Sequence, residues 1–182
     1  MELRMLGIAG ASLLALFWAG VWAGGGTQRE RALLTGHAEV AEREALAAAS
    51  PDDSGAARAL AQAYLDAQQP GLALSVLEGR GGALARDGDP RTRHLYARAL
   101  LDQGRNDEAL AQESNVVASC EPVVEGAAGP RGCDPVLFAA AVRRASILRE
   151  LVALGVEDTR AYPEMSFVAY QNATREARVT MR

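Results

Sequence analysis

The hydrophobic positions divide the chain into one long apolar run and a series of amphipathic segments. The run covers residues 5–23, contains no charged side chain, and is followed by Gly24, Gly25 and Gly26. The nineteen residues of the run would form a helix about 28 Å long, which is the thickness of one hydrocarbon core. This pattern predicts a transmembrane anchor within residues 1–26, with residues 5–23 in contact with the membrane.

A cleaved signal peptide is the alternative interpretation of the same run. Val21 and Ala23 are the small residues before a cut ahead of Gly24. The run is longer than the apolar part of an ordinary signal peptide, which favours the anchor. Residues 27–49 are predicted to form a linker helix and not a coiled coil, because Gly36 and Arg43 interrupt the second apolar stripe.

Amphipathic segments follow from residue 50 onward, and groups of Pro, Gly, Asn and Asp separate them. The first segment begins with Ser50-Pro51-Asp52-Asp53, where Ser50 is expected to cap a helix and the carboxylates to meet its positive end. The chain is therefore expected to be all-α. The predicted helices cover residues 52–67, 71–77 with a second piece reaching 85, 92–103, 107–119, 134–154 and 163–181.

Two of the predicted hairpins repeat 36 residues apart. In the second unit, Gly104 is expected to turn the chain, and Asn106 is expected to cap the helix that follows. Self-similarity at a period of about 20–50 residues is typical of a solenoid. The aligned pairs are Ala109 with Ala73, Leu110 with Leu74, Leu100 with Tyr64, Tyr96 with Leu60, Ala99 with Ala63 and Ala97 with Ala61.

Each unit has a first helix with a large apolar residue, then a small one, then Ala and an aromatic residue or Leu. The two matching stretches are Leu60-Ala61-Gln62-Ala63-Tyr64 and Tyr96-Ala97-Arg98-Ala99-Leu100. The second helices carry Ala73 and Asp107-Glu108-Ala109 at corresponding positions. With this pattern, residues 54–120 resemble the tetratricopeptide repeat family.

The chain departs from that family at three points. Neither unit has the early Trp, Gln68 stands where Gly is usual, and Glu113 stands where a large apolar residue is expected. The resemblance implies a short α-solenoid of antiparallel helix hairpins whose inner groove binds a protein or peptide. The groove residues would be Arg58, Gln62, Leu65 and Asp66 in the first unit and His94, Arg98, Leu101 and Asp102 in the second. An exposed Leu in such a stripe would seat an apolar side chain of the partner.

Beyond the repeats, residues 120–133 contain two Pro and three Gly, which predicts a loop. Cys120 and Cys133 bound this loop and are the only cysteines, so a disulfide that closes it is expected. Two free thiols in a cytosolic chain are the alternative. A disulfide favours an oxidising compartment, as the apolar N-terminal run also does. Residues 134–182 are expected to add a helix pair, either a third hairpin or a cap, so that residues 50–182 form one helical-repeat domain.

Composition and charge exclude several classes of function. Aromatic residues make up only 5% of the chain, and Val and Ile are few, which favours helices over sheets. The net charge of −4, with both signs interspersed, gives no basis for nucleic-acid binding. His37 and His94 have no Cys or acidic residue at ligand spacing, and no serine lies in a nucleophile motif. We therefore expect no metal, no cofactor and no catalysis.

Together these features predict a non-catalytic, membrane-anchored adaptor that binds another protein. The main domain is expected on the periplasmic side of a bacterial cell envelope, since the apolar run and the disulfide agree. Two alternatives remain. The protein is then either an accessory or regulatory subunit of a single envelope enzyme, or an exported soluble binding protein.

Overall fold

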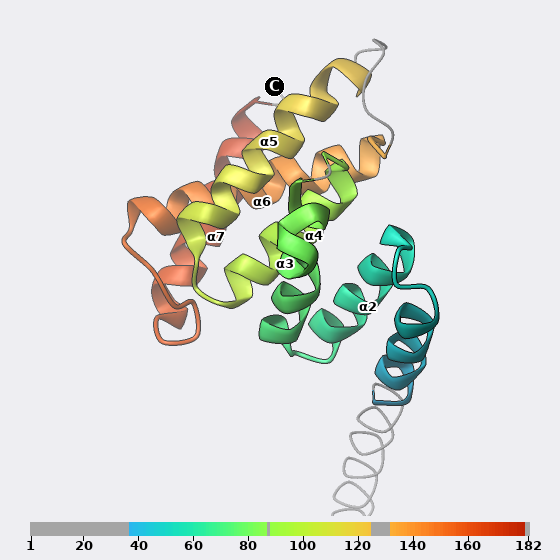
Figure 1. The fold of residues 1–182 in the computed structure, drawn as a ribbon. Helices are drawn as coiled ribbons and strands as arrows, with labels where there is room; N and C mark the ends of the chain where they lie inside the picture. The colour runs from blue at the N-terminus through green and yellow to red at the C-terminus, as the bar shows by residue number, and fades with distance from the viewer. Residues whose placement is uncertain (1–36, 87, 125–131, 181–182) are drawn as a thin grey trace, which may run out of the picture.

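The computed structural model describes residues 37–86, 88–124 and 132–180, and every regular element in these ranges is an α-helix (Figure 1). The prediction of an all-α chain is therefore confirmed for the described residues. A helical segment over residues 37–49 comes first. The helices that follow are α2 (Ser54–Asp66), α3 (Pro70–Arg86), α4 (Pro90–Asp102), α5 (Asn106–Val124), α6 (Pro135–Ala153) and α7 (Pro163–Thr180).

None of the described helices is both long enough and apolar enough to cross a membrane. The predicted span, residues 5–23, lies outside the described part of the chain, as do the first ten residues of the predicted linker helix 27–49.

An aspartate caps the first helix of each hairpin. Asp53, Asp89 and Asp134 each accept a hydrogen bond from the backbone N–H two residues further on, at 2.7, 3.0 and 3.0 Å. The prediction that Ser50 caps the first helix is wrong, because the backbone N–H of Ser50 donates to the carbonyl of Leu46 at 3.1 Å. Ser50 thus ends the preceding helix, and α2 begins four residues later.

The first two hairpins repeat in three dimensions as the sequence predicted. α2 and α4 begin 36 residues apart, and so do α3 and α5. The turn after the first helix uses a left-handed residue in all three hairpins: Gln68 (φ 58°), Gly104 (φ 77°) and Gly155 (φ 66°). The shared turn shows that α6 and α7 form a third hairpin with a more divergent sequence.

Each helix packs on the next one along the chain, and α4 also contacts α2. Figure 1 shows the segment 37–49 at one end of the molecule and α7 toward the other. The core is thin and rich in alanine, as the composition predicted. Its fully buried members include Ala61, Ala73, Leu77, Ala97, Ala99, Leu100, Ala109 and Leu148.

Two helices run through residues that were predicted to interrupt them. α3 is continuous across Gly81 and Gly82, and α5 extends to Val124 with Pro122 inside it. The predicted loop 120–133 is therefore helical in its first residues. Proline lacks an N–H, but near a helix end it removes only one hydrogen bond, so the helix can continue past it.

The turn between α4 and α5 lies against the connection between α6 and α7. A Cβ on Gly104 would lie 2.7 Å from the carbonyl oxygen of Glu157, so only glycine fits there. Asn106 is the first residue of α5 and not its cap, because its side-chain amide donates to the carbonyl oxygen of Val156. The Oδ1 atom of Asn106 is buried without a hydrogen-bond partner. These contacts join the third hairpin to the second.

Candidate functional site

A groove of about 480 Å³ lies between α2, α4 and the start of α6. Its floor is apolar and its rim carries both positive and negative side chains. We call this surface the α2–α4–α6 groove. It is lined by Arg58, Ala59 and Gln62 from α2, Arg91, His94 and Leu95 from α4, and Asp134, Val136, Leu137 and Ala140 at the start of α6.

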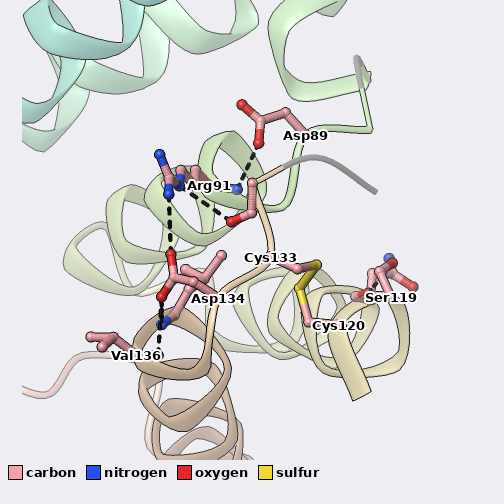
Figure 2. The surroundings of a disulfide bond; sticks show 10 residues. Asp89, Arg91, Ser119, Cys120, Cys133, Asp134 and Val136 are labelled. Atoms are coloured by element: carbon pink, nitrogen blue, oxygen red, sulfur yellow. Dashed lines mark hydrogen bonds and ion pairs between the residues drawn. A yellow bond between two sulfur atoms is a disulfide. The ribbon is translucent and has the colours of Figure 1, made fainter. Parts of the chain in front are cut away.

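The charged rim of the groove is held by ion pairs between elements. Arg58 pairs with Asp89, the residue that caps α4. Arg91 donates to the carboxylate of Asp134 at 3.1 Å and to the carbonyl oxygen of Gly132 at 3.2 Å (Figure 2). The arginines are thus fixed in direction, and their charge is largely balanced within the chain.

Asp134 has two roles in this rim. Its carboxylate caps α6 by accepting from the backbone N–H groups of Val136 and Leu137, and it also pairs with Arg91. The backbone hydrogen bond from Leu137, followed by the hydrogen bond from Arg91, lowers the pKa of Asp134 below its ordinary value. Both partners favour the charged carboxylate, so the rim keeps its negative group down to acidic pH.

A disulfide joins the end of α5 to the residue before Asp134 (Figure 2). Cys120 and Cys133 are bonded with their Cα atoms 5.3 Å apart, which confirms the pairing predicted from the sequence. Cys120 is fully buried, against Ala141 and Val116. A crosslink that closes a loop of this size stabilises a fold by about 3 kcal/mol. It also limits how far Gly132 and Asp134 can move from Arg91.

A buried carboxylate lies behind the groove. Glu113 of α5 has no exposed surface, and its oxygens contact His94 Nδ1 at 2.9 Å and a guanidinium N–H of Arg144 at 3.1 Å. Arg144 also donates to the backbone carbonyl of His94 at 3.3 Å. A buried charge is tolerated only when it is paired and hydrogen-bonded, and both conditions hold here. Glu113 therefore fixes the ring of His94 where that ring faces the groove.

The groove contains three of the eight residues that the sequence predicted to face a partner: Arg58, Gln62 and His94. Asp66 and Arg98 form an ion pair with each other at 3.1 Å, and Gln62 also donates to Asp66. Asp102 is exposed at the last position of α4.

The expectation of an exposed leucine stripe is wrong for Leu65 and only partly met by Leu101. Leu65 is 2% exposed and belongs to the main core, while Leu101 is half-buried and packs against it. Both lie where the groove face meets the buried face, and burial of a large apolar side chain is favoured by about 2 kcal/mol. The apolar surface of the groove comes instead from Leu95 and from Val136 and Leu137 of α6.

Sequence reasoning did not identify the third wall of the groove. The repeat pattern ends near residue 120, so it gave no register for α6, which supplies Val136, Leu137 and Ala140. The available signal was Asp134-Pro135, a helix start like Asp89-Pro90. Alignment of those two pairs would have placed the beginning of α6 beside the beginning of α4.

The chemistry of the groove suits binding through shape and hydrogen bonds. Its ionisable groups are engaged with partners inside the chain, and its floor is formed by aliphatic side chains. Among the described residues, no group of three or more His, Cys, Asp or Glu side chains is placed to hold a metal ion. His37, the other histidine, is exposed on the segment 37–49, far along the chain from the groove.

In comparisons with known proteins, no family model matches the chain, and neither a curated protein nor a solved structure matches it. The case for a function therefore depends on the groove, the helix arrangement and the N-terminal apolar run.

Proposed function

We propose that this protein is a non-catalytic adaptor of the tetratricopeptide-repeat type, a short α-solenoid that binds a segment of another protein in the α2–α4–α6 groove. The observation that carries the proposal is the groove itself, because the first helices of three successive hairpins contribute to it. In repeat proteins of this architecture, the surfaces formed by successive repeats are extended and concave and serve for binding.

The repeat geometry supports the assignment to this type of fold. The helix starts recur at 36 residues, and the left-handed turn recurs in each hairpin. The small residues of the resemblance, such as Ala61, Ala97 and Ala109, are fully buried. They are the positions where closely packed helices leave no room for a larger side chain.

The groove favours an extended peptide with an apolar side chain. Leu95 of α4 and the α6 wall with Val136 and Leu137 offer apolar surface to such a side chain. Gln62 and His94 on the rim can exchange hydrogen bonds with a peptide backbone. Because Arg58 and Arg91 are already paired, a partner carboxylate would have to compete with Asp89 and Asp134 for them.

The cellular placement is part of the proposal. The apolar run at residues 5–23 supports attachment to a membrane, and the Cys120–Cys133 disulfide supports an oxidising compartment for the helical domain. We therefore propose an adaptor anchored in the cell envelope with its groove on the periplasmic side. Sequencing of the N-terminus of the mature protein tests the anchor: retention of Met1 agrees with it, and a start at Gly24 contradicts it.

The groove is tested by filling it without changing charge. Ala140 is exposed in the groove, and Ala111 is also exposed, on α5 outside it. The full chain is solubilised from membranes as wild type, Ala140→Trp and Ala111→Trp, and stoichiometric co-purifying proteins are compared. We expect Ala140→Trp to lose a partner that Ala111→Trp retains. Equal recovery with both variants would contradict the groove as the binding site.

A further inference from the structure

The outer face of α7 carries large apolar side chains that are exposed. Phe167 is 61% exposed and Val168 is 44% exposed, and Met165 is exposed on the Val168 side. Tyr170, on the Phe167 side, is partly covered by Arg143 of α6, whose guanidinium lies 5.4 Å from the centre of the ring. The opposite face of α7, with Ala169 and Ala173, packs on α6. A contiguous group of exposed apolar side chains marks an interaction surface more often than single ones do.

Charged residues flank this apolar face in a specific order. Glu164 lies near the start of α7 and Arg175 near its end, and both are exposed. They are eleven residues apart, which is about three helical turns, so both lie on the face that carries Val168. Neither side chain makes a hydrogen bond or an ion pair with another described residue.

We infer that α7 binds α7 of a second copy of this chain, antiparallel and across a two-fold axis. A two-fold interface requires one surface that is complementary to itself. When two α7 helices run antiparallel, Glu164 of each copy lies opposite Arg175 of the other, and Val168 of each copy lies opposite Gln171 of the other. The acidic start and basic end of one helix face, with exposed apolar side chains beside them, provide this complementarity.

The test uses the full chain in a non-ionic detergent, with mass measured by sedimentation velocity over a range of concentrations. We expect a reversible dimer. Glu164→Arg alone, or Arg175→Glu alone, replaces two attractive contacts with two like-charged ones and should raise the dimer dissociation constant about tenfold. A mixture of these two variants restores opposite charges across the axis, so a heterodimer should form with near wild-type affinity.

Apolar contacts are tested with a matched pair of exposed residues. Phe167→Glu should abolish the dimer, whereas Leu72→Glu on α3, also an exposed large hydrophobic, should leave it unchanged. A single-chain mass at every concentration would overturn the inference. It would equally be overturned by a dimer that ignores Phe167→Glu and the charge reversals, because association would then occur elsewhere, for example through the N-terminal apolar run.

Discussion

Gln68 holds a backbone conformation that glycine adopts at lower cost. Its φ of 58° lies in the left-handed region, and the corresponding residue of the next hairpin is Gly104 with φ 77°. For a residue with a Cβ, this conformation costs about 1–2 kcal/mol. The hydrogen bonds of the two turns match, since Gln69 N donates to the Tyr64 carbonyl as Arg105 N does to that of Leu100. The helices on either side thus impose the turn on Gln68.

Gln68→Gly should therefore raise the free energy of unfolding by about 1 kcal/mol. The gain is smaller than the full cost of the left-handed conformation, because glycine also gives the unfolded chain more conformational entropy than Gln does. Gly104→Gln should lower it by more, because its Cβ would lie 2.7 Å from the carbonyl oxygen of Glu157. Chemical denaturation followed by circular dichroism measures both. A loss of stability in Gln68→Gly would contradict the strain described for this turn.

Removal of Arg144 should cost more stability than removal of Glu113, because Glu113 is the fully buried member of the pair. Arg144→Met removes a cation and leaves a carboxylate with no exposed surface, so the expected cost is about 3 kcal/mol. Glu113→Leu removes the carboxylate from Arg144 and His94, but Arg144 keeps its hydrogen bond to the carbonyl of His94. The two side chains are also 25% and 19% exposed and reach water. This second change should cost about 1 kcal/mol. Equal costs in chemical denaturation would show that Glu113 is not a buried charge.

Among single residues, the sequence identified the unusual positions but not the side chains that contact them. Gln68 and Glu113 stood out because they depart from the repeat pattern. The partner Arg144 lies in α6, beyond the repeats, so no spacing rule linked it to Glu113. Leu65 was misassigned because periodicity places a residue on a helix face but does not say how far a neighbouring helix covers that face.

Among the elements, the segment 37–49 is attached to the helical domain by a hydrogen bond from α2 and by apolar packing. The hydroxyl of Tyr64 donates to a carboxylate oxygen of Glu44 at 2.6 Å, and Val40 is the buried apolar residue of the segment. The hydrogen bond to Glu44, together with burial, raises the pKa of Tyr64 to about 12. This contact determines how firmly the segment between the helical domain and residues 5–23 is held.

Tyr64→Phe should weaken the attachment by about 1 kcal/mol. Hydrogen exchange should then rise in residues 37–49 and stay unchanged in α5, which is the internal control. The pH dependence has a defined sign. Because the folded pKa of Tyr64 lies above the unfolded value of 10.0, its contribution is intact below pH 10 and is lost as pH rises toward 12. Exchange in residues 37–49 that is the same in both proteins would contradict this attachment.

Most helices could be predicted, because the Asp and Pro residues at their starts are ones that commonly cap or begin a helix. Asp134-Pro135 and Pro163 begin helices where the sequence placed them, and α4 begins at Pro90, two residues before its predicted start. The errors came from residues that usually interrupt helices. Gly81, Gly82 and Pro122 lie within helices although each opposes a helix by a local propensity of about 1–3 kcal/mol.

For the whole molecule, the α2–α4–α6 groove depends on contacts between distant parts of the chain. Arg58 pairs with Asp89 across 31 residues, and Arg91 pairs with Asp134 across 43. The disulfide holds the start of α6 in this arrangement. The sequence predicted the repeat, the disulfide and three groove residues. It could not predict the wall from α6, because that wall follows from how the hairpins stack and not from any local pattern.

If the α2–α4–α6 groove binds a protein segment, a reactive side chain inside the groove lies against that segment and can be crosslinked to it by light. A photoreactive amino acid replaces Ala140 in the groove or, as the control, Ala111 on α5, and intact cells are irradiated. We expect a discrete adduct with one envelope protein from position 140 that is absent from position 111. No adduct from position 140, or the same adducts from both positions, would contradict it.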